Sequence, residues 1–182
     1  MPVLDPGYTG WAIQVKDMPP ELAKFWKRDV KYAKQLLAEA GYPNGGEFPL
    51  LLRLLAGFTD RIVRYSNDLG EAGIKLNIKS ISSSEYVGTA FIGKYSGASA
   101  GGGWANPDPG MLLVQKFHPL STVTNSGHVN DPVATRMLDE QARILDTQKR
   151  KKLIHDIQLY LAPKMYYVPQ AAGYGYSLNS AR

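Results

Sequence analysis

The sequence contains no cysteine among its 182 residues, which excludes disulfide bridges, thiol nucleophiles and thiolate metal sites. It also lacks any apolar run close to the roughly 18 residues that span a bilayer. Residues 1–14 do not show the basic and then apolar pattern of a signal peptide, so we expect either a cytosolic protein or a piece of a longer one. What remains is a globular chain of one-domain size with a sizeable core.

The positive charge of the chain is not concentrated in one place. The formal net charge is +5 at pH 7, but most basic residues are interleaved with acidic ones. The dense cluster Lys149–Lys152 would spread around a helix instead of forming one stripe. Nucleic acid is therefore not an expected partner.

Apolar periodicity and capping signals predict helices that alternate with strands. Residues 1–28 carry several prolines and are predicted to form an extended lead-in without a core of its own. Helices are expected over Asp29–Ala40, Asp60–Ala72, Pro132–Leu145 and Gln148–Leu161, with a short one from Ser82 to about Gly93. Strands are expected at Phe48–Leu55 and Ile74–Ile78, within Ser96–Gly103, and at Met165–Val168. This alternation predicts an α/β lobe with a largely parallel or mixed sheet. Its predicted core residues are Leu37, Leu69, Ile78, Leu138 and Ile157.

One stretch has the pattern of a catalytic serine. Gly97–Gly101 matches G-x-S-x-G, and Asp131 and His155 follow Ser99 in the chain order of the α/β-hydrolases. That chemistry needs a sharp turn from a strand directly into a helix, whereas glycines and prolines follow here and prevent a prompt helix start. We therefore expect Ser99 to be inert and the chain not to be an enzyme, with a small serine hydrolase as the alternative.

The histidines do not have the spacing of a metal site. His118, His128 and His155 stand 10 and 27 residues apart, so no two of them share a helix face as metal ligands commonly do. Glycine-rich phosphate-binding patterns do not occur either. No metal and no cofactor is expected.

The loop from Trp104 to Gly110 is the remaining candidate for binding a small molecule. An aromatic residue follows three glycines, and Asn106 and Asp108 are interleaved with prolines. This combination presents an apolar face and hydrogen-bonding groups on a backbone with few alternative conformations. A generic turn around a buried tryptophan would show the same spacing.

Four stretches, taken in order, resemble the family 5 extracellular solute-binding proteins, the group that contains dipeptide-, oligopeptide- and nickel-binding proteins. They are Asp29–Gly46, Leu69–Ile78, Gly101–Leu113 and Asn130–Pro169, the last with Asp146 and Arg150 in the spacing of the family. The resemblance covers nearly the whole chain. Because members of the family are much longer and have two lobes, the chain resembles only their carboxy-terminal lobe.

The resemblance implies one lobe of a type II periplasmic-binding-protein-like fold, with a mixed sheet of about four or five strands flanked by helices. Residues 29–172 would be the ligand-binding lobe, 1–28 the lead-in and 173–182 a tail that returns toward the missing amino-terminal lobe. The full protein would be the periplasmic or extracytoplasmic substrate-binding component of an ABC transporter, and a monomer. Its expected partners are a peptide or other small nutrient, the missing lobe and an ABC permease.

Within that lobe, the resemblance implies that the loop forms one wall of the ligand cleft. Trp104 would supply an apolar or stacking surface, and Asn106 and Asp108 would supply polar groups. Peptide-binding members carry an aspartate three residues after the tryptophan, and it pairs with the ligand's ammonium group, but here that residue is Pro107. Asp108 could substitute, although its Asp-Pro context favours a helix cap. We therefore expect a sugar, a modified peptide or an opine-like compound instead of a peptide with a free amino terminus.

A third interpretation comes from the basic helix Gln148–Leu161. A cytosolic interaction domain could use this helix to bind an acidic partner, and such binding would be sensitive to salt.

Overall fold

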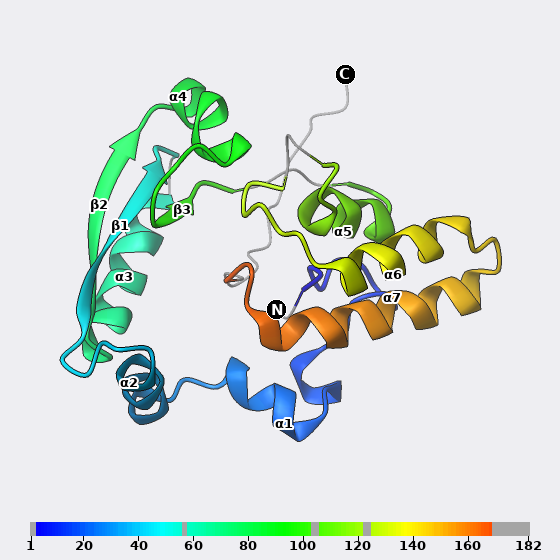
Figure 1. Cartoon of the computed structure of the whole chain (residues 1–182), viewed down its shortest axis with the longest axis horizontal. Helices are drawn as coiled ribbons and strands as arrows, with labels where there is room; N and C mark the ends of the chain where they lie inside the picture. The colour runs from blue at the N-terminus through cyan, green and yellow to red at the C-terminus, as the bar shows by residue number, and fades with distance from the viewer. Residues whose placement is uncertain (1–2, 56–57, 103–105, 122–124, 169–182) are drawn as a thin grey trace, which may run out of the picture.

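The chain folds into a parallel sheet with its own helices and a layer of three further helices beside it (Figure 1). The computed structural model describes residues 3–55, 58–102, 106–121 and 125–168. Around the sheet lie α2 (Val30–Glu39), α3 (Phe58–Glu71) and α4 (Ser83–Gly88), and the helical layer consists of α5 (Pro109–Phe117), α6 (Pro132–Arg143) and α7 (Thr147–Leu161). The four long helices predicted from the sequence are α2, α3, α6 and α7, so those predictions are confirmed to within two residues at each end.

The described sheet has three strands, all parallel, in the order β2-β1-β3. They are β1 (Gly46–Arg53), β2 (Ile74–Ile81) and the short β3 (Ala98–Ala100). The α/β class is as predicted, but the described residues contain fewer strands than the four or five expected and no antiparallel pair. Strands that follow one another in the sequence are connected by helices, α3 between β1 and β2 and α4 between β2 and β3, as parallel strands require.

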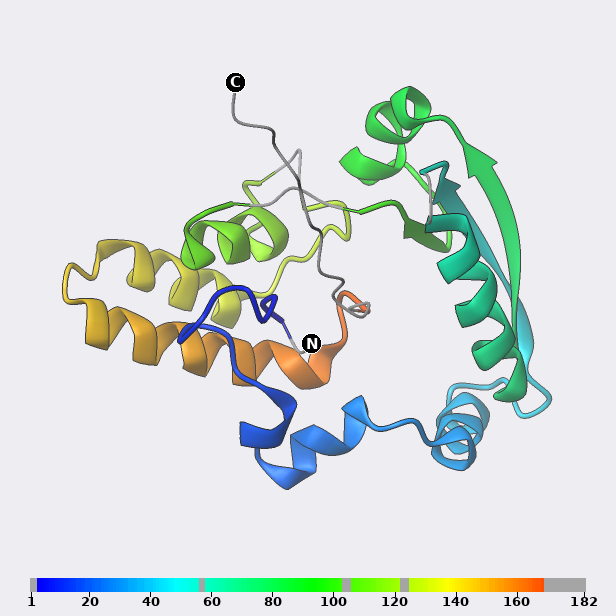
Figure 2. The same ribbon diagram turned by 180° about the vertical axis from the view of Figure 1, so that it is seen from behind.

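Both faces of the sheet carry apolar clusters. On one face, Ile62 of α3 packs against Leu50 and Leu52 of β1. The other face is covered by α4 and by the 3-10 turn Ala90–Ile92. Buried Tyr86 of α4 and Phe91 of the turn form a cluster with Ile81 at the end of β2. Figure 2 shows α3 running along the strands from behind. Because helices cover both faces of the sheet, the central strand β1 consists almost entirely of apolar residues.

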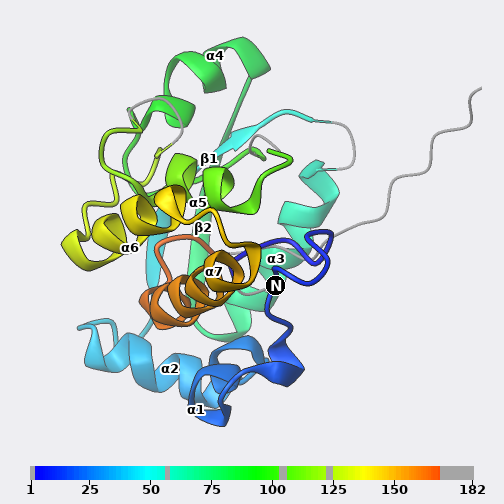
Figure 3. The same ribbon diagram turned by 90° about the vertical axis from the view of Figure 1, so that its right-hand side faces the viewer.

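The helical layer holds the larger core cluster. Leu113, Leu138, Ile154 and Ile157 contribute side chains that are completely buried between α5, α6 and α7. Leu4, from the beginning of the chain, is also buried in this cluster. Figure 3 shows the helical layer in front of the sheet, with the first residues running across α7.

The capping residues read from the sequence mark the helix starts. The carboxylates of Asp29, Asp131 and Asp146 accept hydrogen bonds from backbone N–H groups in the first turns of α2, α6 and α7. At the other end of α2, Gly41 adopts φ 91° and the N–H of Tyr42 reaches the carbonyl of Leu37 at 2.8 Å. This is the glycine stop that the sequence predicts.

Two predicted extended segments have other conformations. Within the described residues 3–28 lie the 3-10 turn Val15–Asp17, the short helix α1 (Pro20–Ala23) and the 3-10 turn Lys24–Trp26, so this lead-in is not extended throughout. Met165–Val168 is not a strand either, because Met165 has φ 48°, in the left-handed region. The predicted tail, residues 173–182, lies outside the described residues.

Burial agrees with two of the five predicted core residues and contradicts one. Leu138 and Ile157 are fully buried, whereas Leu37 and Leu69 are half-buried. Ile78 is 38% exposed, so its prediction as a core residue is wrong. It lies on β2, which in the sheet formed by the described residues pairs with β1 alone. The alternation of residues predicts which face a side chain uses, but not whether another element covers that face.

We expect Leu138→Ala and Ile157→Ala each to destabilise the chain by about 2–5 kcal/mol, because each leaves a cavity in a packed core. Ile78→Ala should cost less than about 1 kcal/mol, because a side chain that is 38% exposed gains less from burial. Urea denaturation of the three variants would test this difference. An Ile78→Ala loss as large as the other two would contradict the assignment.

Candidate functional site

The carboxyl ends of the three parallel strands lie at one edge of the sheet, the usual position of ligands in open α/β folds. β1 ends there at Arg53, and β3 leads into the loop 101–108. The predicted Trp104 lies outside the described residues, while Asn106 and Asp108 are described. The structure thus places two of the three predicted site residues on the chain segment that leaves this edge.

Asn106 is held by contacts on two sides. Its Oδ1 accepts a hydrogen bond from the N–H of Asp108 at 2.9 Å, and its backbone carbonyl accepts one from the hydroxyl of Tyr8. The second contact ties the loop to a residue 98 positions earlier in the chain. Both of these contacts use oxygen atoms of Asn106 as acceptors.

Both carboxylate oxygens of Asp108 are engaged within the protein. Oδ1 accepts hydrogen bonds from the backbone N–H of Met111 and from Nη2 of Arg150, each at 2.7 Å. Oδ2 accepts one from Nη1 of Arg150, also at 2.7 Å. The hydrogen bonds from Arg150 lower the pKa of Asp108, with a further contribution from the N–H of Met111, against the opposing effect of partial burial. Asp108 is therefore an ionised cap of α5 in a bidentate ion pair.

Arg150, on α7, is fixed by the cap residue of α5, by a residue of α6 and by the first segment of the chain. Its Nε donates to Oε1 of Gln141 on α6 at 3.1 Å, and its guanidinium lies 5.8 Å from the ring centre of Trp11. Gly110 provides the space for this arrangement, since a Cβ there would come within 2.2 Å of Gln141 Oε1 and 2.5 Å of Arg150 Nη2. Sequence reasoning noted Arg150 only as part of a family pattern and missed its contact with Asp108.

A second arginine, Arg53, lies where the loop begins. Its Nε donates to Oγ of Ser83 at 3.1 Å, and its Nη1 lies 3.4 Å from the carbonyl oxygen of Gly101. Its guanidinium carbon is 5.8 Å from the ring centre of Tyr86. Sequence reasoning also missed Arg53. Its position could have been noticed, because it is the one charged residue within the apolar run 48–55.

The residues of the hydrolase pattern do not have the local structure of a nucleophile elbow. Ser99 lies within β3, paired with Leu51, and the next helix begins only at Pro109. Asp131 caps α6, and His155 lies in the middle of α7. Within the described residues there is also no group of three His, Asp or Glu side chains that could hold a metal ion.

Asp131 is the centre of a polar cluster that joins α6 to the end of α7. Burial raises the pKa of its carboxyl group, but the N–H of Ala134, the hydroxyls of Tyr160 and Tyr166 and the ammonium of Lys164 outweigh this effect. The resulting pKa is about 2. The cluster fixes the chain after α7 to the start of α6.

The depressed pKa of Asp131 predicts an acid-sensitive contribution to stability. Because the carboxyl titrates at about 2 when folded and at 3.8 ordinarily, its contribution is present above about pH 4 and is lost as the pH falls toward 2. Asp131→Asn should therefore destabilise the chain at pH 7, on the order of 1–2 kcal/mol, and show a smaller loss between pH 5 and pH 2.5 than the wild type. Urea denaturation of both proteins across this range measures it. Parallel pH curves would contradict the assignment.

The dual role of Asp108 can be separated by two substitutions. Asp108→Asn retains a capping oxygen and loses the charge, whereas Asp108→Ala loses both. We expect Asp108→Ala to be less stable than Asp108→Asn by about 1 kcal/mol, the usual value of a cap. Thermal and urea denaturation would measure both, and equal stabilities would argue against the cap.

Comparisons with known proteins agree with this fold. No family model matches the chain. Heme-binding protein A of Haemophilus influenzae is 25% identical over 204 residues, covering 99% of this chain and 35% of that protein. The periplasmic binding protein DppA of Helicobacter pylori, solved with the peptide STSA, has a TM-score of 0.75 and 23% identity, covering 91% of this chain and 31% of its own. The mannohexaose-bound periplasmic oligopeptide-binding protein of Thermotoga maritima has a TM-score of 0.65 and 23% identity, covering 90% of this chain and 34% of its own.

The chain thus spans about a third of the length of these relatives. None of the helices in the described residues is long and apolar enough to cross a membrane. These relatives are a heme-binding protein and two periplasmic binding proteins, one solved with a peptide and one with mannohexaose. The chain therefore has the fold of one lobe of a periplasmic solute-binding protein and is similar to those of family 5.

Proposed function

We propose that the chain is the carboxy-terminal lobe of the solute-binding component of an ABC importer and supplies one wall of its ligand cleft. The observation that carries the proposal is the match of nearly the whole chain to about a third of a binding protein solved with its peptide ligand. The full protein would lie in the periplasm or another extracytoplasmic space. It would act as a monomer and deliver its ligand to a permease.

In this proposal the loop 101–108 is the ligand wall. Trp104 provides an apolar or stacking surface, and the Nδ2 group of Asn106 donates a hydrogen bond to the ligand. Asp108 lies behind them, because its two oxygens are already bonded to Arg150 and to the N–H of Met111. It therefore contributes by holding the loop in place.

Transport begins with capture of the ligand and closure of the two lobes about a hinge. Closure is driven only by contacts that exist in the closed state, so a single lobe should bind little. No covalent step is needed, and the placement of Ser99 inside a strand supports a binding role over a hydrolytic one.

The ligand class follows from the absence of a carboxylate that could receive an ammonium group on this wall. Pro107 stands where peptide-binding members have the aspartate, and Asp108 is neutralised by Arg150. A buried ammonium without a counter-charge costs several kcal/mol. The ligand would then be a sugar, a modified peptide or an opine-like compound, a range compatible with the mannohexaose bound by the Thermotoga maritima protein.

Calorimetry of the full-length protein and of this chain alone tests the proposal. The panel consists of di- and tripeptides, their N-acetylated forms and neutral oligosaccharides. We expect the full-length protein to bind a member of the panel, with no submicromolar affinity that depends on a free amine, and the chain alone to bind much more weakly. Submicromolar peptide binding that disappears on acetylation would show that an ammonium site exists and that the ligand class is wrong.

A further inference from the structure

We propose that His128 is a positioning residue that locks the sheet to the helical layer and thereby fixes the span of the loop 101–108. The lock consists of the imidazole of His128 and the backbone carbonyl of Gly93. Its effect on the ligand rests on the proposed function, because that function makes the loop the ligand wall. The lock itself forms without a ligand.

The loop bridges two parts of the molecule. Within the described residues, the chain passes between the helical layer and the sheet twice, before α2 and after β3 (Figure 1). The first connection is held to α3 by Arg28, whose Nη2 lies 2.8 Å from Oε2 of Glu71. The second connection is the loop 101–108, which continues β3 and ends at the ion pair of Asp108 with the helical layer. The distance that the loop spans therefore depends on how the sheet lies relative to that layer.

His128 stands on a segment that is fixed to the helical layer. Its neighbour Val129 is buried in the core of that layer, and the N–H of Gly127 donates to the hydroxyl of Tyr167 at 3.1 Å. The buried side chain of Asn125 accepts from the N–H of Val129 at 2.9 Å and donates to the Val129 carbonyl at 2.8 Å. The backbone of His128 therefore moves with the helical layer.

From this base, the ring of His128 reaches the part of the chain that covers the sheet. Its Nε2 lies 3.0 Å from the carbonyl oxygen of Gly93. Because a carbonyl oxygen only accepts, Nε2 carries the proton and donates it. Gly93 follows the 3-10 turn Ala90–Ile92 and precedes the segment that enters β3. The hydrogen bond thus connects the helical layer to the stretch from which β3 and then the ligand wall continue.

The backbone of both partners has an uncommon conformation at this contact. His128 has φ 49°, in the left-handed region, which is rare for residues with a side chain but in which histidine is enriched. Gly93 has φ 78°, and a Cβ there would come within 2.1 Å of Nε2 and 2.5 Å of Cε1 of the His128 ring. Any side chain at position 93 would therefore displace the ring from the carbonyl.

Loss of the lock would allow the sheet to turn about the first connection, since hinges in proteins consist of a few loop residues. Such a turn would move β3 relative to the start of α5, and the two ends of the loop 101–108 would change their separation. A ligand would then have to order the wall when it binds. Ordering a mobile loop lowers affinity.

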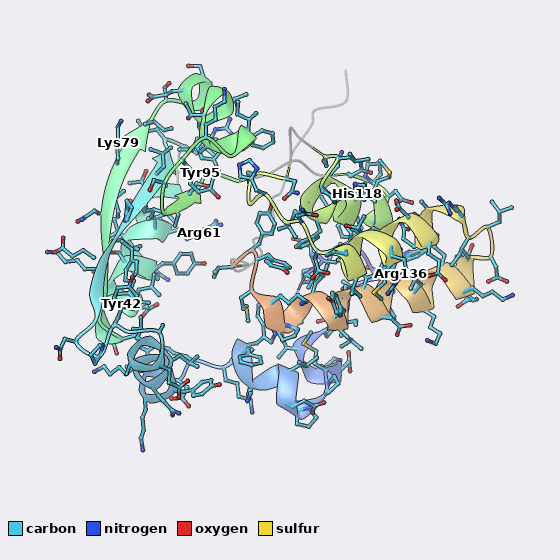
Figure 4. The ribbon with its side chains drawn as sticks, viewed as in Figure 1. Tyr42, Arg61, Lys79, Tyr95, His118 and Arg136 are labelled. Carbon is cyan, nitrogen blue, oxygen red and sulfur yellow. The ribbon has the colours of Figure 1, made fainter. Side chains whose placement is uncertain are left out.

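The lack of cysteine makes this motion accessible to spin labelling. Lys79 and Arg136 are both exposed. Figure 4 shows Lys79 on the outer side of β2 and Arg136 on the helical layer. Lys79→Cys and Arg136→Cys together therefore place one label on each part. Double electron–electron resonance then measures the distribution of distances between the two labels.

We expect a narrow distribution in the labelled chain with His128 intact. His128→Asn should broaden it, because asparagine tolerates the left-handed backbone but its shorter amide does not reach Gly93. Gly93→Ala should broaden it as well, because the added Cβ displaces the ring. The double variant should be no broader than either single variant, since both remove the same contact. His128→Gln should restore part of the narrow distribution, because its amide nitrogen extends as far as Nε2.

The matched control is Lys152→Gln. It removes an exposed ion pair, from Nζ of Lys152 to Oδ2 of Asp156 at 2.8 Å, that lies entirely within α7. The distribution should stay narrow in this variant. Broadening equal to that of His128→Asn would overturn the lock, because it would show that any lost surface contact has the same effect.

Calorimetry of the full-length protein with mannohexaose and N-acetylated tripeptides measures the effect on the ligand wall. We expect His128→Asn and Gly93→Ala each to weaken the probe that binds by about three- to tenfold, the cost of ordering a few additional groups. Lys152→Gln should leave the affinity unchanged.

The outcomes separate the lock from the proposed function. A distribution that stays narrow in both His128→Asn and Gly93→Ala would overturn the lock, and either variant carries the test if the other does not fold. Broad distributions with unchanged affinity would overturn the role in the ligand wall and leave the proposed function intact. Binding of no probe by the wild type would overturn the proposed function and that role with it, while the distance measurements still decide the lock.

Discussion

The ion pair between Asp108 and Arg150 is the contact on which the arrangement of the helical layer and the loop 101–108 depends. Its two N–H···O bonds of 2.7 Å join the first turn of α5 to α7, and Gln141 adds α6. A bidentate guanidinium–carboxylate pair has a narrow range of geometries, so the end of the loop has little freedom to move relative to the helices. A Cβ at Gly110 would come within 2.2 Å of Gln141 Oε1 and 2.5 Å of Arg150 Nη2, so a side chain there would displace these two groups.

The same pair affects the charge of the sheet edge. Because Arg150 neutralises Asp108, the loop offers no free carboxylate, and the unpaired charge at its other end belongs to Arg53. The loop is therefore held at both ends by arginines with different roles. Arg150 is paired with a carboxylate, and Arg53 with the hydroxyl of Ser83 and the carbonyl of Gly101.

Much of the local structure could be predicted because its causes lie within a few residues. Asp29, Asp131 and Asp146 bond to N–H groups two or three positions further along, so their helix starts follow from the sequence. The prediction of a strand at Met165–Val168 was wrong because the conformation of this segment depends on residues far away in the sequence. Tyr167 in that segment donates to the carbonyl of Lys116, 51 residues away, and such a contact cannot be predicted from neighbouring residues.

The sequence by itself determined the α/β alternation, the four long helices, their caps and the resemblance to family 5, because each depends on periodicity or on neighbouring residues. Only the tertiary structure decided that Asp108 pairs with Arg150, that Arg53 ends beside Gly101 and that Ile78 stays exposed. The residues of these two contacts are 42 and 48 positions apart, and the exposure of Ile78 depends on which elements cover β2. Such contacts arise only when segments distant in the sequence are packed together, and a local pattern does not show which segments become neighbours.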